Sequence, residues 1–180
     1  MDLIDVVQKD HETVEALLER VATVTGKRRE GAFARLRGEL VRHEVAEEEI
    51  VHPLTRSFVG NGDRIAKARV HEEEKAEGIL KKMERLEIGT PPWERLFGRL
   101  RTAVLEHAEK EETIEHPRLR ERVEKKDLAR HGRAFQSMKK LAPTRPHPGT
   151  PNSAVANMAA GPVAALVDRA RDAASEAVAR

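Results

Sequence analysis

The chain has 180 residues, of which 36% are charged and 3% aromatic, and its formal net charge is +2. It has no cysteine, which excludes disulfides, thiolate metal sites and iron–sulfur clusters. No apolar run approaches the roughly 20 residues of a membrane span, and no basic block stands apart from acidic residues, so we expect a cytoplasmic protein with neither membrane nor nucleic-acid partners.

Apolar residues recur every three or four positions and predict helices over about 2–25, 31–58, 63–86, 92–115 and 127–141. Four long helices with short connections favour an all-α, up-down-up-down four-helix bundle over residues 1–120. The helix within 121–141 is expected to pack on or near that bundle. Residues 142–180 begin with a Pro-rich linker and continue as an Ala-rich helical tail. Neither the role of this tail nor the oligomeric state follows from the sequence.

An internal repeat is the most informative feature of the sequence. Residues 43–53 read HEVAEEEIVHP and residues 107–117 read HAEKEETIEHP, with six of the eleven positions identical. His11 precedes the first copy by 32 residues and His71 precedes the second by 36. The chain is therefore predicted to contain two helix pairs, each with one His on its first helix and His-x-x-x-Glu on its second.

The repeated His and Glu coincide with the apolar stripes of their helices. His43 and Glu47 are four residues apart, as are His107 and Glu111, so each pair projects from one helix face. An ionised carboxylate buried without a partner costs several kcal/mol, and no Lys or Arg occupies these stripes. Two metal ions bridged by the carboxylates would supply the missing charge. Nitrogen and oxygen ligands without sulfur favour iron, with manganese or zinc as alternatives.

These motifs resemble those of the hemerythrin-like (HHE, cation-binding) family, in which His, His-x-x-x-Glu, His and His-x-x-x-Glu follow one another on four helices. The resemblance covers about residues 1–120, and the C-terminal extension is similar to that of actinobacterial members. It implies a non-haem di-iron centre, oxo- or hydroxo-bridged, in a four-helix bundle. It assigns bridging roles to Glu47 and Glu111 and terminal roles to four histidines: His11, His43, His71 and His107.

One departure bears on function. Oxygen-carrying members have a second His one turn after the third-helix ligand, where this chain has Lys75. The coordination could be completed by water or by another side chain, and five residues stay open as candidates: Glu44, Glu72, Glu74, and the histidines His52 and His116, each of which stands before a proline at an expected helix end.

An open coordination position favours reaction with a small oxidant. We therefore predict a di-iron protein that decomposes hydrogen peroxide in a catalase-like reaction relevant to oxidative stress. The alternative from a different class is a protein that binds or senses oxygen, nitric oxide or iron without turnover. A helical interaction module that holds no metal is the third hypothesis.

Overall fold

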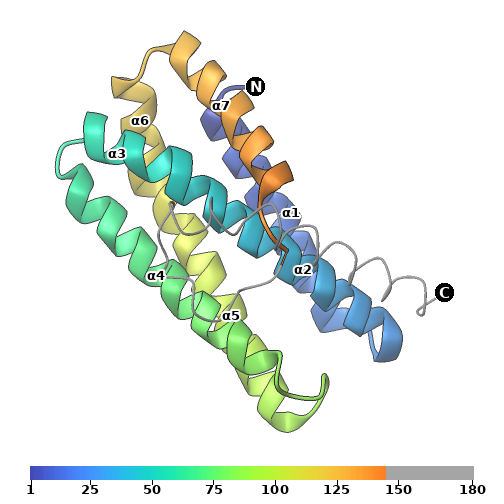
Figure 1. The fold of residues 1–180 in the computed structure, drawn as a ribbon. Coiled ribbons are helices and arrows are strands. Elements are labelled where there is room, and N and C mark those ends of the chain that lie inside the picture. Colours follow the sequence, from blue (N-terminus) through green and yellow to red (C-terminus); the bar gives the residue numbers. More distant parts are fainter. Residues whose placement is uncertain (145–180) are drawn as a thin grey trace.

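The computed structural model describes residues 1–144. It contains four long helical segments, each antiparallel to the one before it in the chain (Figure 1). The first segment is α1 (Leu3–Thr23) and the third is α4 (Gly62–Met83). The second joins α2 (Gly26–Ala46), the π-helical turn η1 (Glu47–Val51) and α3 (His52–Phe58). The fourth joins α5 (Pro91–Lys110), η2 (Glu111–Glu115) and α6 (His116–Arg122). The fold is thus an all-α bundle, as predicted, and residues 1–144 contain no strand.

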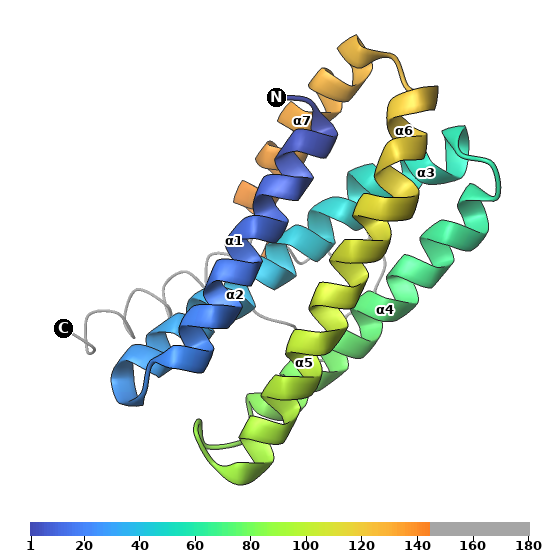
Figure 2. The same cartoon turned by 180° about the vertical axis from the view of Figure 1, so that it is seen from behind.

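A further helix, α7 (Lys125–Leu141), packs on the outside of α1 and α2. Seen from behind, α7 lies beside α1 (Figure 2). Its Phe135 is fully buried, in the same apolar cluster as Leu3 and Val7 of α1. Within residues 1–144 no helix has the length and apolar character needed to cross a membrane. The predicted linker and tail fall largely on residues 145–180, outside the described part of the chain.

Local sequence explains where several helices begin. Asp2 caps α1, and its side chain and that of Asp5 accept hydrogen bonds from each other's backbone N–H. Pro91 opens α5, where a missing N–H costs no helical hydrogen bond. Asn61 adopts a left-handed conformation (φ 60°) before Gly62, and a Cβ on Gly62 would lie 1.9 Å from the Thr55 carbonyl oxygen. Only glycine fits that turn.

The two repeat copies continue as helices past their prolines, which corrects two predictions. The fourth segment ends at Arg122 rather than near residue 115, and His52 and His116 lie inside helical segments rather than at their ends. A π-turn precedes each proline, and the backbone N–H groups of His52 and His116 bond to the carbonyls of Glu47 and Glu111, five residues back. Each proline then occupies the first turn of a new α-helical stretch, where its ring and missing N–H are tolerated.

A polar layer divides the interior of the bundle between two apolar clusters. Leu18, Leu36 and Trp93 belong to one cluster and are fully buried, which contributes about 1.5–3 kcal/mol for each side chain. Val51 and Leu119 belong to the other cluster, at the opposite end of the bundle. Between the two clusters each long segment contributes buried His or Glu side chains. The metal hypothesis therefore concerns this layer.

Candidate metal centre

Two glutamates occupy the middle of the polar layer. Glu47 and Glu111 begin η1 and η2, and both are fully buried. None of their four carboxylate oxygens has a hydrogen-bond partner within residues 1–144. No Lys or Arg of that range forms an ion pair with either residue. These carboxylates face only imidazole nitrogens, which leaves room for a cation between them.

One group of potential ligands gathers on the side of α1. It comprises His11, His43, Glu47 and Glu111, each of which offers one ligand atom, and these atoms all lie within 4.8 Å of one another. His43 Nε2 is 3.0 Å from Glu47 Oε1, and His11 Nε2 is 3.3 Å from Glu111 Oε2 and 4.0 Å from Glu47 Oε1. Two imidazoles and two carboxylate oxygens make a suitable donor set for one divalent or trivalent ion.

A second group gathers on the side of α4 and uses the other oxygens of the same carboxylates. His107 Nε2 lies 3.7 Å from Glu47 Oε2, 3.6 Å from Glu111 Oε1 and 3.9 Å from Glu73 Oε1. Glu47, Glu73 and His107 form a second set with ligand atoms within 4.8 Å. Glu47 and Glu111 thus each present one oxygen to each group, as expected of carboxylates that bridge two cations.

The π-turns bring one more histidine to each group. His52 Nε2 is 2.7 Å from Glu73 Oε1, and His52 is fully buried. The His116 ring stacks on the His11 ring with centroids 6.0 Å apart, and neither of its nitrogens has a hydrogen-bond partner in the described chain. In a regular α-helix, residues five apart differ in direction by about 140°. The wider π-turn reduces this difference, so a histidine five residues after the glutamate also points inward.

Acidic side chains outside the centre orient three of the imidazoles. Their Nδ1 atoms contact carboxylates, with His11 at 2.7 Å from Glu112, His43 at 3.4 Å from Asp10 and His107 at 3.3 Å from Glu72. Because each Nδ1 is engaged outward, each Nε2 faces the two central glutamates. This carboxylate–imidazole arrangement fixes the ring tautomer and raises the basicity of metal-binding histidines.

His71, to which the resemblance assigns a terminal ligand role, does not join the others. Its side chain is 64% exposed, and its Nδ1 lies 3.6 Å from the exposed Glu74. The buried side of α4 instead carries Ala66, Glu73, Ala76 and Met83, so the inward position falls two residues after His71. Glu72, one of the candidates to complete the coordination, instead contacts Nδ1 of His107 from outside the centre. Alanines make the buried side of α4 hard to recognise in the sequence.

Burial and charge act in opposite directions on the titration of the central groups. Burial alone would keep the imidazole of His43 neutral, but Glu47 and Asp10 raise its pKa to about 10. For His52, Glu73 likewise outweighs burial and raises the pKa to about 9. Burial lowers the pKa of His116. The pKa of Glu47 falls well below its usual range because the attraction of His43 and His107 outweighs burial. Without a metal, protons carry the positive charge that the carboxylates require.

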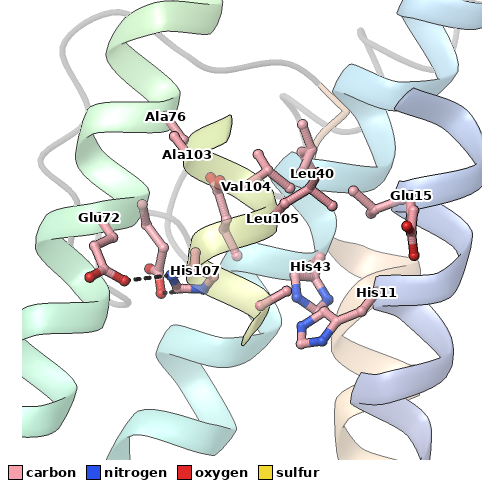
Figure 3. A pocket seen from close by; sticks show the side chains of 14 residues that line it. His11, Glu15, Leu40, His43, Glu72, Ala76, Ala103, Val104, Leu105 and His107 are labelled. Atoms are coloured by element: carbon pink, nitrogen blue, oxygen red, sulfur yellow. Dashed lines mark hydrogen bonds and ion pairs between the residues drawn. The ribbon is translucent and has the colours of Figure 1, made fainter. Parts of the chain in front are cut away.

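A small cavity lies against the centre, and Figure 3 shows His11, His43 and His107 at its floor. Its volume is about 30 Å³, enough for about two water-sized molecules. Leu40, Ala76 and Val104 are among its apolar lining residues, and Glu44 also lines it. Only a very small ligand fits there.

Comparisons with known proteins identify a cation-binding family. The model of the family described as the Hemerythrin HHE cation binding domain matches residues 2–119. A hemerythrin-like protein of Schizosaccharomyces pombe is 26% identical over 173 residues, which cover 93% of this chain and 84% of that protein. A DNA nickase of Nostoc is 23% identical over 140 residues, and the match spans 77% of this chain but 39% of the nickase.

The fold also matches a crystal structure of a hemerythrin HHE cation-binding domain-containing protein from Mycobacterium kansasii. The TM-score is 0.69 and the sequence identity 17%, with 78% of this chain and 86% of the other covered. At this identity the likeness concerns the fold alone.

Proposed function

The chain belongs to the hemerythrin HHE cation-binding family, and from that premise we propose that its polar layer holds two iron ions and decomposes hydrogen peroxide. The observation that carries the proposal is the arrangement of Glu47 and Glu111. Both carboxylates are buried without a Lys or Arg partner in residues 1–144, and each divides its oxygens between two groups of imidazole and carboxylate ligands.

The unpaired polar atoms fit a metal in this layer. Nε2 of His11, His43 and His107 lacks a hydrogen-bond partner within the described residues, as do both oxygens of Glu47 and Glu111. Orphaned buried polar atoms are strongly destabilising unless something binds them. We assign His11, His43 and His116 to one ion, and Glu73, His107 and His52 to the other, with Glu47 and Glu111 shared. His71 has no place in this assignment.

The proposed reaction consumes two molecules of hydrogen peroxide. One is reduced to two molecules of water, and the other is oxidised to dioxygen and supplies the two electrons and two protons that the first requires. Iron in this layer would supply the redox couple and the Lewis acidity. No external reductant is needed, and the atoms and charges balance.

The protein's own side chains define what can reach the centre. The cavity of about 30 Å³ admits peroxide, oxygen or nitric oxide and excludes organic substrates. Its apolar wall, which includes Leu40 and Val104, limits access of bulk water. Glu44 lines the cavity, and burial together with the nearby Glu73 carboxylate raises its pKa well above the usual range. A proton held on the Glu44 carboxyl would therefore lie beside a peroxide molecule that entered this cavity.

The test is oxygen evolution from hydrogen peroxide by the iron-loaded protein, measured with an oxygen electrode. We expect a rate well above that of the same concentration of free iron. The Glu111→Gln variant should lose this rate, whereas Glu74→Gln, an exposed substitution on α4, should retain it. A rate no higher than that of free iron would refute the peroxide reaction.

A second candidate function uses the same centre without turnover. The apolar cavity is the observation that favours it, because an uncharged diatomic gas fits there as well as peroxide does. A stable oxygenated or nitrosylated spectrum without peroxide turnover would favour a binding or sensing protein. Far less than one metal ion per chain, in protein purified without chelators, would favour the metal-free helical module.

A further inference from the structure

A basic groove runs between α4 and α5 on the outside of the bundle. Its volume is about 800 Å³, which is within the range of small-molecule sites. Lys75 and Lys82 line it from α4, and Arg95 and Arg99 line it from α5. All four side chains are exposed, and none forms an ion pair with a carboxylate of residues 1–144.

Several other cations of the same helices are paired. On α4, Lys67 and Lys81 lie 2.8 Å from Asp63 and Glu77, and on α5 Lys110 lies 2.7 Å from Glu72. The four groove residues instead line one groove together, with Glu106 as the one acid in its lining. Like charges that converge without counter-charges repel one another, so an anion bound between them would be stabilised by all four.

The shape of the groove comes from glycine. Gly78 of α4 and Gly98 of α5 line it, and a Cβ placed on either glycine would have no heavy atom within 4 Å outside its own helix. The space above these glycines is therefore open between the long basic side chains. Lys75 and Lys82 are seven residues apart, a distance of about 10 Å along the helix. This length suits a short chain of charged groups and is too short for an extended nucleic-acid site.

We propose that this groove binds a small molecule carrying two or three phosphate groups, such as a nucleoside triphosphate or inorganic tripolyphosphate. Four cations and one carboxylate leave an excess of three positive charges, which is complementary to the negative charge of such an anion. The two guanidinium groups can each form paired hydrogen bonds to phosphate oxygens, while the two ammonium groups act as point charges. Ala103 lines both this groove and the cavity of the metal centre, so the bound anion would lie close to that cavity.

The experiment is calorimetric titration of the full chain with inorganic tripolyphosphate and, separately, with ATP, at low ionic strength. We expect binding at one site per chain, weakened as salt is raised. The double variant Lys82→Ala/Arg99→Ala should weaken it at least 30-fold, because removing a charge-assisted hydrogen bond weakens binding about tenfold or more. The control Lys125→Ala/Arg133→Ala removes two exposed cations outside the groove and should bind as the unmodified protein does.

A second variant tests the groove rather than its charge. Gly78→Leu/Gly98→Leu keeps every cation and fills the open space, and it should weaken binding by at least tenfold while the helical circular dichroism is retained. Binding by ATP but not tripolyphosphate would assign the site to nucleotides, and equal binding would assign it to the phosphate chain itself. No binding at millimolar ligand, equal weakening in the control, or tighter binding of a DNA duplex per site would overturn the proposal.

Discussion

The two halves of the proposed metal layer are built from the same repeat but differ at one position. On the α1 side, His11 stands with His43 of the first repeat copy and with His116. On the α4 side, Glu73 stands with His107 of the second copy and with His52. The histidines that follow the π-turns change sides, since His52 follows the first copy and His116 the second. The approximate two-fold symmetry is therefore broken by one pair, His11 and Glu73.

Because of this difference, the two proposed cation positions should have unequal chemistry. The α1 side offers three imidazoles and the α4 side offers two imidazoles and one carboxylate, besides the shared Glu47 and Glu111. A carboxylate adds negative charge and a harder donor, so the α4 position should favour the more oxidised or harder ion. Substitution of a shared ligand should therefore disturb both positions, and substitution of an unshared ligand should disturb one.

The largest effect should follow the loss of a shared carboxylate. Glu47→Gln removes the charge that both positions require, so we expect metal content to fall from two ions per chain to fewer than about 0.5. Loss of the tightly bound metal ions lowers the apparent free energy of unfolding by about 4 kcal/mol. For a chain of this size that corresponds to a decrease in Tm of about 8–16 °C. Elemental analysis and calorimetry measure both. An unchanged metal content would show that Glu47 does not bridge.

Loss of a ligand from one half should be less severe. His11→Ala and Glu73→Ala should each reduce the metal content from two ions to about one, because the other half keeps its own ligands and the shared carboxylates. Glu73→His should keep two ions and make the halves alike, with a shifted visible absorption of the iron-loaded protein. His71→Ala is the control on the same helix and should leave two ions. Equal losses in Glu73→Ala and His71→Ala would contradict the assignment.

The contrast between His71 and Glu73 also shows how far the sequence could be read. Spacing alone predicted the bundle and the inward direction of His11, His43, Glu47, His107 and Glu111, because leucines and valines surround these residues on their helices. On α4 the buried face carries Ala66 and Ala76, which are only weakly apolar, and the more apolar but half-buried Ile65 favoured a register rotated by one residue. His71 matched the third-helix histidine of the family motif, and the weak apolar pattern of α4 did not point to Glu73 instead.

The π-turns account for the other errors. A regular α-helix that turns His107 and Glu111 inward would also turn Ile114 inward, yet Ile114 is 41% exposed and Glu115 is fully buried. One additional residue in the turn rotates all that follows, and with it His116. The His-Pro pair five residues after each glutamate was the available signal, since a proline that does not end a helix requires a change in the hydrogen-bond pattern.

A smaller effect should follow from protons that occupy the centre in place of metal. The pKa of His43 is raised to about 10 and that of His52 to about 9, so both stabilise the metal-free fold fully below about pH 6.5. That contribution is lost as the pH rises towards 9–10. The metal-loaded protein should not show this loss, because its imidazoles are already neutral.

Thermal unfolding of chelator-treated and iron-loaded protein between pH 6 and 10 measures this difference. We expect the Tm of the metal-free protein to fall across the range while that of the loaded protein changes little. Titration with metal at pH 7.5, in two buffers of different ionisation enthalpy, should detect release of at least one proton per chain. Parallel pH profiles with and without metal would contradict the exchange of protons for cations.

The smallest effect should come from Lys139 of α7, which acts on the centre only through Asp10. Lys139 forms ion pairs with Asp10 and Glu39, and Asp10 in turn contacts His43 Nδ1. Lys139→Met keeps the apolar stem and removes the charge that holds Asp10. Loss of a carboxylate that orients a ligand costs 10–100-fold in metal affinity, and loss of its support should cost less, about three- to tenfold.

The weakening should concern the ion on the α1 side, since Glu72 and Lys110 orient His107 independently of α7. Competition with a metal indicator measures it, with Arg133→Met, an exposed residue of the same helix, as the control. If both ions weakened equally, α7 would stabilise the bundle as a whole rather than one half of its centre.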